Sequence, residues 1–319
     1  MALSQSFSVG SLRCHLLEAG DQWLDGGAMF GVVPKPLWSR RATPDAKNRI
    51  PLAMRCVLVE HPDGLVLIDT GLGNKEDEKF LEIYGVKNEG NPTQLEDAIR
   101  AAGHRPEDVS LVINTHLHFD HAGGNTRRSG GQADRRSDLF DRPPAGPPDR
   151  PALAFPKALY VVQKKELDFA RHTNERTRAS YLPHNFEPVA EASRWKLLDG
   201  PGEIIPGISA MMTPGHVPWH QSIVIRNGGE TVVFLGDIIP TAAHLPLPYI
   251  MGYDLEPLRT LETKRSLLQD AVNGGWRFIF EHDPVVALAR VVEDGKAAGL
   301  ADVVVSGTGK REPGTGASA

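Results

Sequence analysis

The sequence is poor in cysteine, with two such residues, Cys14 and Cys56, among 319. Both fall in strand-like apolar runs, so we expect reduced, buried side chains rather than a disulfide. Long apolar runs are lacking too, since no stretch approaches the roughly 20 apolar residues of a membrane span. Residues 1–6 have neither the basic nor the apolar segment of a signal peptide. We therefore expect a cytoplasmic protein that does not bind membranes.

A large excess of charge of either sign is also missing. The chain has 35 Lys and Arg against 40 Asp and Glu, a formal net charge of −5. This balance gives no support for binding a polyanion, so no nucleic-acid partner is expected. A hydrophobic content of 40% and a charged content of 24% are ordinary for a globular protein.

The most informative stretch is Thr-His-Leu-His-Phe-Asp-His-Ala-Gly-Gly at positions 115–124. Within six residues it holds His116, His118, Asp120 and His121. Imidazole and carboxylate groups suit zinc and similar divalent ions. The apolar run at 111–113 predicts a buried strand that ends in this loop. The alternative is a chance cluster of surface histidines, and the spacing favours a metal site.

Three further ligand-type residues each follow a strand-like run, namely His216, Asp237 and His282. With the loop they make seven candidate ligands, whereas a single zinc ion takes about four. Seven protein ligands and a bridging water suit two ions about 3.5–4 Å apart. The sequence therefore predicts a dinuclear site.

The order HxHxDH, His, Asp, His resembles the metallo-β-lactamase superfamily of hydrolases, as does Leu-Ile-Asp-Thr-Gly at 67–71. The resemblance extends from about residue 6 to residue 306. It implies that His116, His118 and His216 hold a first metal ion, that Asp120, His121 and His282 hold a second, and that Asp237 bridges both. It also implies that Asp69 orients a ligand through a hydrogen bond. The alternative for Asp69 is an ordinary turn residue.

The strand and helix patterns predict a mixed α/β fold, and the resemblance implies its four-layer αββα form. Because the ligands run from His116 to His282 and must converge, we expect a single catalytic domain over 1–306. We expect loop insertions at about 21–50 and 125–154 and a flexible tail at 307–319. The basic, proline-rich insertion at 125–154 is interpreted as a surface loop, with a contact for an anionic partner as the alternative.

Two divalent ions favour hydrolysis but do not select the substrate. Within the superfamily, the segments at 26–31 and 118–124 most resemble the quorum-quenching acyl-homoserine-lactone lactonases. That resemblance implies lactone opening by a metal-bridging hydroxide, with Asp120 managing the proton and Tyr181 contacting the substrate. Met29, Phe30 and Phe119 are candidate pocket walls, with core packing as the alternative for each.

Two other functions stay open at this point. A phosphotriesterase or arylesterase of the methyl-parathion-hydrolase type has the same metal ligands, and a non-catalytic metal-binding module is a third hypothesis. Zinc is the expected ion, although manganese, iron or cobalt also accept nitrogen and oxygen ligands. The expected partner is a small lactone or ester, and a homodimer is an expectation from similar enzymes.

Overall fold

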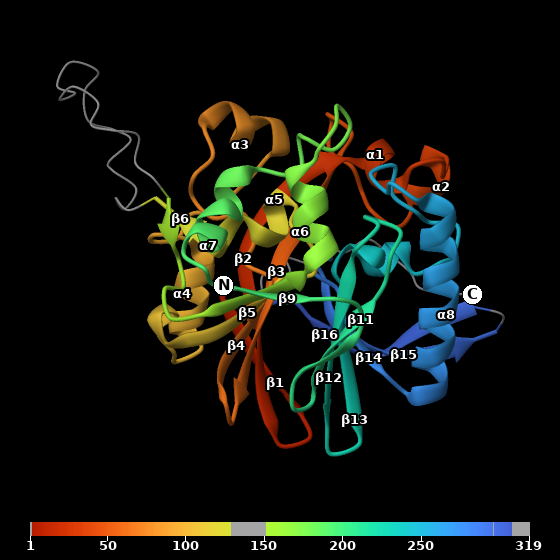
Figure 1. Cartoon of the computed structure of the whole chain (residues 1–319). Coiled ribbons are helices and arrows are strands. Elements are labelled where there is room, and N and C mark those ends of the chain that lie inside the picture. Colours follow the sequence, from red (N-terminus) through yellow and green to blue (C-terminus); the bar gives the residue numbers. More distant parts are fainter. Residues whose placement is uncertain (1, 129–150, 296, 308–319) are drawn as a thin grey trace.

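The protein, seen in a computed structural model that describes residues 2–128, 151–295 and 297–307, contains two seven-stranded β-sheets (Figure 1). The first sheet has the order β1-β2-β3-β4-β5-β8-β9 and the second the order β10-β11-β12-β13-β14-β15-β16. The strands of the first sheet are β1 (Ser4–Val9), β2 (Leu12–Asp25), β3 (Arg49–His61), β4 (Gly64–Ile68), β5 (Val109–Ile113), β8 (Leu159–Gln163) and β9 (Trp195–Leu198). Those of the second are β10 (Gly202–Ile205), β11 (Ile208–Met212), β12 (Gln221–Asn227), β13 (Glu230–Phe234), β14 (Arg277–Ile279), β15 (Val286–Asp294) and β16 (Ala297–Val305).

Helices cover the outer faces of both sheets (Figure 1). The α-helices are α1 (Gly26–Phe30), α2 (Lys35–Trp38), α3 (Glu78–Tyr84), α4 (Gln94–Ala101), α5 (Phe119–Ala122), α6 (Lys164–Arg171), α7 (Glu187–Glu191) and α8 (Pro257–Gly274). Short 3₁₀ helices are η1 (Pro106–Asp108), η2 (Gly123–Asn125), η3 (Pro183–Asn185), η4 (Gly236–Ile238) and η5 (Ala242–His244). Helix α4 packs on the first sheet through Leu95 and Ile99, and α8 packs on the second through Leu268 and Ala271. The predicted four-layer αββα fold is confirmed.

Side chains alternate along each strand between the core that lies between the two sheets and the layer of helices outside. In β3, Val57 and Val59 face the core between the two sheets, whereas Cys56 and Leu58 face the helices outside. Cys14 belongs to the core between the sheets, so the two cysteines lie on opposite faces of one sheet. Both are unpaired and buried, as the sequence predicts.

The loop predicted at 21–50 is shorter than expected. Strand β2 runs on to Asp25 and pairs with β3 down to Arg49, so only 26–48 connects them, and this part contains α1 and α2. The register of β2 shifts between Glu18 and Asp21, where Gly20 has a φ of +124°. This bulge interrupts the alternation of apolar residues, so the sequence pattern places the start of the loop at about residue 21, which lies within β2.

Two expected irregular segments fall largely outside the described residues. Of the insertion at 125–154, the structure describes the two ends, where β6 (Thr126–Arg127) pairs with β7 (Ala152–Leu153). Of the tail at 307–319, it describes only residue 307. In the described ranges, no helix combines the length and apolar character needed to cross a bilayer.

Candidate metal centre and substrate cavity

The loop with the first four candidate ligands leaves the carboxyl end of β5 and turns into α5. It is packed against the loop after β4, because Thr70 N donates to the carbonyl of His121 (2.8 Å) and Gly124 N donates to that of Gly71 (2.9 Å). A Cβ atom at position 124 would clash with the carbonyl oxygen of Thr70, so the close approach requires glycine. The Asp-Thr-Gly motif and the histidine motif are therefore parts of one packed unit.

The first group of convergent side chains consists of His116, His118, His216 and Asp237, all of them buried. Nε2 of His216 lies 3.1 Å from Nδ1 of His118 and 3.1 Å from Oδ2 of Asp237. Nε2 of His116 is buried and has no hydrogen-bond partner in the described part of the chain. These donor atoms point to one common position.

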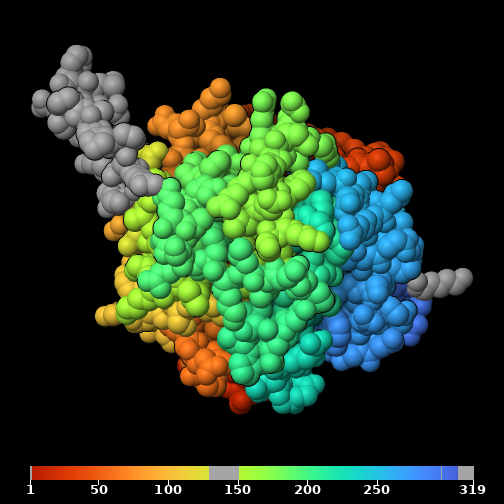
Figure 2. Space-filling view, viewed as in Figure 1, coloured from red at the N-terminus to blue at the C-terminus, as the bar shows by residue number. Residues whose placement is uncertain are grey.

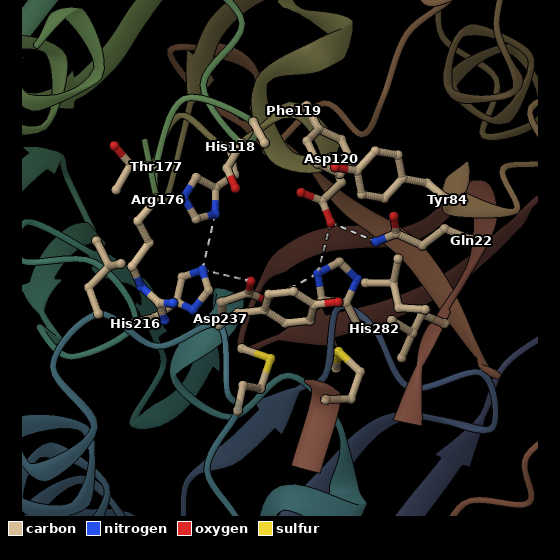
Figure 3. Close-up of a pocket in the computed structure, with 18 residues that line it drawn as sticks. Gln22, Tyr84, His118, Phe119, Asp120, Arg176, Thr177, His216, Asp237 and His282 are labelled. Atoms are coloured by element: carbon tan, nitrogen blue, oxygen red, sulfur yellow. Dashed lines mark hydrogen bonds and ion pairs between the residues drawn. The ribbon is translucent and has the colours of Figure 1, made fainter. Parts of the chain in front are cut away.

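The second group consists of Asp120, His121 and His282. The Nε2 atoms of His121 and His282 lie 3.3 Å apart. Oδ1 of Asp120 is 3.8 Å from Nε2 of His121, and its Oδ2 is 3.7 Å from Nε2 of His282. Asp237 lies between the two groups (Figure 3), because its Oδ2 faces His216 while its Oδ1 is 3.0 Å from Nε2 of His282.

The spacing of these donors fits two small divalent ions. In a tetrahedral site with Zn–N bonds of about 2.0–2.1 Å, two ligand nitrogens lie about 3.3 Å apart. The observed nitrogen pairs are 3.1 and 3.3 Å apart. Burial, with the neighbouring imidazoles, holds the pKa of His116 and of His118 well below its usual range. Both rings are therefore neutral, which is the form that binds a metal ion.

A second set of contacts holds the candidate ligands in place. Nδ1 of His121 lies 3.0 Å from Oδ2 of Asp69, and Nδ1 of His216 lies 2.9 Å from Oδ1 of Asp254. Nδ1 of His282 donates to a backbone carbonyl oxygen of β3 at 2.7 Å. Each contact occupies the ring nitrogen that faces away from the centre and so sets the orientation of the imidazole. Asp69 thus lies in the position expected for an orienting residue.

Five of the candidate ligands line a cavity (Figure 3), namely His118, Asp120, His216, Asp237 and His282. Its apolar wall consists of Leu24, Met29, Leu52, Phe119, Met251 and Leu255. The polar residues among those that line it, apart from the candidate ligands, include Gln22, Tyr84, Arg176, Thr177, Ser180 and Tyr253. A mostly apolar cavity with a few polar groups above a metal centre is typical of a small-molecule site.

The rim of the cavity comes from segments far apart in the sequence. Helix α3, helix α1 and the segment 176–180 meet at the top of the molecule in Figures 1 and 2. Nη2 of Arg176 donates to the carbonyl oxygen of Gly252 (2.9 Å), which links the segment 176–180 to the loop before α8.

Two of the three predicted wall residues, Met29 and Phe119, line the cavity. Phe30 does not, and that prediction is wrong. Its side chain is fully buried and stacks between Trp38 and His244, with ring centroids 5.2 and 4.5 Å away. Successive residues of a helix point in different directions, and in α1 Met29 faces the cavity while Phe30 packs in the core.

Tyr181 does not line the cavity either. Its ring packs against His118 with the centroids 4.7 Å apart, and its hydroxyl donates to Oε1 of Glu166 at 2.9 Å. The same oxygen accepts a hydrogen bond from Leu117 N (3.1 Å), within the histidine motif. Tyr181 therefore packs against the ligand loop on the side away from the cavity. It does not lie where it could contact a substrate in the cavity, contrary to the prediction.

Sequence reasoning missed several residues of the site, among them Gln22, Tyr84, Arg176, Tyr253 and Asp254. Each lies outside the short motifs and reaches the centre only through the fold. Asp254 carried the weak signal of an acidic residue just before a helix, but nothing local connects it with His216.

Comparison with known proteins decides the family. The model of the Metallo-beta-lactamase superfamily matches residues 51–282. The chain belongs to this superfamily. An N-acyl homoserine lactonase of Bacillus cereus is 27% identical over 195 residues, which cover 59% of this chain and 64% of the relative. The match thus spans less than two thirds of that lactonase.

Solved structures extend the likeness over nearly the whole chain. A probable metal-dependent hydrolase from Staphylococcus aureus superposes with a TM-score of 0.82 and 29% identity, covering 95% of this chain and 99% of the other. AidC, described as a dizinc quorum-quenching lactonase and solved with a product, superposes with a TM-score of 0.74 and 19% identity over 94% of this chain and 98% of its own. At that identity the second comparison shows a shared fold.

Proposed function

We propose that this protein is a dinuclear metal-dependent hydrolase that opens lactones, with N-acyl homoserine lactones as the first candidates. The observation that carries the proposal is the arrangement of seven ligand-type side chains in two groups, joined by Asp237, at the floor of an apolar cavity. The similarity to a Bacillus cereus lactonase supports the lactone class among the ester substrates that such a centre accepts.

The ions proposed here are held by His116, His118 and His216 on one side and by Asp120, His121 and His282 on the other, with Asp237 bridging. When bound, two divalent ions supply hydroxide near neutral pH and polarise an ester carbonyl. Zinc fits the nitrogen-rich donor set, and manganese, iron and cobalt are the alternatives that metal analysis of the purified protein distinguishes.

The side chains around the ions have separate tasks in this proposal. Asp120 faces the cavity. In this proposal it would take up the proton of the nucleophile and pass it to the alkoxide oxygen that is freed when the ring C–O bond breaks and that stays attached to the opened product. Partial burial raises the pKa of Tyr253 to about 12, and burial together with Asp120 raises that of Tyr84. Both phenols stay protonated at neutral pH, so they donate hydrogen bonds to the lactone or amide carbonyl in place of Tyr181.

The apolar wall accounts for the acyl chain. Met29 and Leu52 are buried core residues that also border the cavity, and Met251 closes it from the loop before α8. Methionine side chains adapt to varied apolar ligands. The wall therefore favours a hydrophobic acyl substituent over a charged one.

A second candidate, an aryl phosphotriesterase, rests on one observation. Tyr84 and Phe119 form a tilted ring pair with centroids 4.7 Å apart at the cavity wall. Such a pair offers a stacking surface for an aromatic leaving group.

Proton release by the metal-loaded protein tests the proposal. The panel contains acyl-homoserine lactones of several chain lengths, simple γ- and δ-lactones and an aryl phosphotriester, with chelator-treated protein as the control. Turnover of lactones with little on the phosphotriester is the expected result. Turnover of the phosphotriester alone supports the second candidate, and an inert protein that holds two ions is a non-catalytic binding module.

A further inference from the structure

A second cluster of ligand-type side chains lies apart from the cavity. Nε2 of His15 and Nε2 of His104 lie 2.8 and 2.9 Å from the same oxygen, Oε1 of Glu60. The two imidazole rings meet edge to face, with centroids 5.7 Å apart and an interplanar angle of 77°. Two ring nitrogens and a carboxylate oxygen therefore converge from three separate segments of the chain.

The fold sets this convergence. His15 lies on β2 and Glu60 on the neighbouring β3, while His104 follows α4. The His15 side chain is 2% exposed, so its ring has a fixed orientation. Its Nδ1 lies 3.2 Å from the Ser6 hydroxyl, which accepts a hydrogen bond when Nδ1 carries the proton. That tautomer leaves the lone pair of Nε2 free to bind a cation.

The cluster is far from the catalytic centre. Glu60 lies seven residues along β3 from Ala53, whose carbonyl oxygen accepts the hydrogen bond of His282. At about 3.3 Å per residue the two ends of this segment are about 23 Å apart. In Figure 1 the β3–β4 hairpin lies at the bottom of the molecule, whereas α5 lies near the top.

We propose that His15, Glu60 and His104 form a third metal site, which binds zinc or a similar transition-metal ion. Two imidazoles and a carboxylate are a donor set that zinc accepts, with water in the fourth position. The Glu60 and His104 side chains are 32% and 24% exposed, so water reaches the site and both can move the few tenths of an ångström that coordination requires.

One neighbouring charge opposes the cation. Nε of Arg13 lies 3.8 Å from Oε1 of Glu60, but its side chain is 63% exposed and turns into solvent at little cost. The bound ion ties the end of α4 to two strands of the first sheet. Its effect is therefore on stability rather than on turnover, and the proposal does not depend on the proposed lactonase activity.

Zinc content tests the third site. Zinc is titrated calorimetrically into wild-type protein that already carries two equivalents, and bound zinc is counted by mass spectrometry after gel filtration. The wild type should take up one further equivalent. His104→Gln and Glu60→Gln should stop at two, with unchanged lactone turnover. His172→Gln, which changes a histidine with a 74% exposed side chain directly after α6, is the matched control and should still take up the third.

Thermal unfolding gives an independent reading. Excess zinc should raise the unfolding midpoint of the wild type and of His172→Gln by a few degrees above the value with two equivalents, and should not raise that of His104→Gln. Since His104 and Glu60 are partly exposed, both variants are expected to fold, which circular dichroism checks. A wild type that saturates at two equivalents, or variants that keep the third, would overturn the proposal.

Discussion

Gln22 donates a hydrogen bond of 2.6 Å from Nε2 to Oδ2 of Asp120. The contact joins β2 to α5, and both side chains are buried and lie side by side in Figure 3. The same oxygen of Asp120 faces Nε2 of His282 at 3.7 Å. Gln22 therefore holds the carboxylate that the proposed mechanism uses both as a ligand and as a proton carrier.

Gln22→Ala should lower kcat/KM for lactones by roughly tenfold, because loss of a partner that orients a metal ligand costs about 10–100-fold in metal affinity or activity. The change should lie mainly in kcat, since Gln22 positions Asp120 rather than the substrate. Steady-state kinetics with metal analysis measure it. Gln269→Ala, on the exposed face of α8, is the control. Equal kinetics for the two variants would remove Gln22 from the positioning role.

Asp237 is proposed to bridge the two metal ions. Asp237→Ala should remove bound metal and activity together, because the side chain faces His216 through one oxygen and His282 through the other. His121→Ala should leave at most one tightly held ion. Metal content per chain is measured beside turnover, with Asp168→Ala on the surface of α6 as the control. Turnover like the wild type in Asp237→Ala would exclude the bridging assignment.

Tyr253 and Tyr181 are expected to have different roles, the first in substrate binding and the second in stability. Tyr253→Phe should lower kcat/KM by roughly 2–10-fold, the effect of one hydrogen bond of about 0.5–1.5 kcal/mol, without a change in stability. Tyr181→Phe should instead lower the free energy of unfolding by about 1 kcal/mol, since its hydroxyl donates to the buried Glu166. Kinetics and urea unfolding of both variants measure the difference. The reverse pattern would restore Tyr181 as the contact with substrate.

Local motifs explain how much of the site was predictable. Each candidate ligand, or group of ligands, comes shortly after the end of a strand. The sequence alone therefore identifies these residues as candidate ligands. Gln22 lies beyond the bulge at Gly20, where the strand pattern breaks, and Asp254 lies in a loop without periodicity. Their place beside Asp120 and His216 follows from packing between distant segments, which no window of sequence contains.

The wrong prediction for Phe30 also arises from packing that the local sequence does not determine. An apolar residue in a short helix is equally compatible with a cavity wall and with the core, and the packing of Phe30 on Trp38 settles the choice. The fold was easier to predict, because the signals that mark strands and the starts of helices are local. At the start of α4, for example, Thr93 Oγ1 accepts a hydrogen bond from Glu96 N at 3.2 Å and so caps the helix.

Lys264 is expected to hold one wall of the cavity in place. Its Nζ donates to the carbonyl oxygens of His244 (2.6 Å), Pro246 (3.0 Å) and Tyr249 (2.7 Å), and its side chain is buried. Lys264→Met should lower the free energy of unfolding by roughly 2–4 kcal/mol, because three buried carbonyls lose their donor. The substitution should also raise KM, because the chain directly after Tyr249 carries Met251, which lines the cavity. Calorimetry and kinetics test this prediction, with Lys164→Met at an exposed position as the control. An unaltered KM would show that this loop does not contribute to substrate binding.

Glu166 is expected to make the stability of the native protein depend on pH. Burial raises the pKa of Glu166 to about 7 from an ordinary value of 4.5. Below pH 4.5 the carboxyl group is neutral in both states and carries no penalty. Between pH 4.5 and 7 the unfolded chain releases the proton while the native state keeps it, so native stability falls as the pH rises. Above pH 7 the loss is complete and amounts to at most about 3 kcal/mol.

Glu166→Gln should abolish that loss, because the amide is neutral at every pH and its oxygen still accepts from Leu117 N and Tyr181. The free energy of unfolding of the variant relative to the wild type should therefore rise between pH 4.5 and 8. Urea unfolding across this range measures it, and acid loss of metal affects both proteins alike. Glu187→Gln is the control of opposite sign, since a hydrogen bond from Arg171 lowers the pKa of Glu187. Parallel pH curves for Glu166→Gln and the wild type would show that Glu166 is ionised within the native protein.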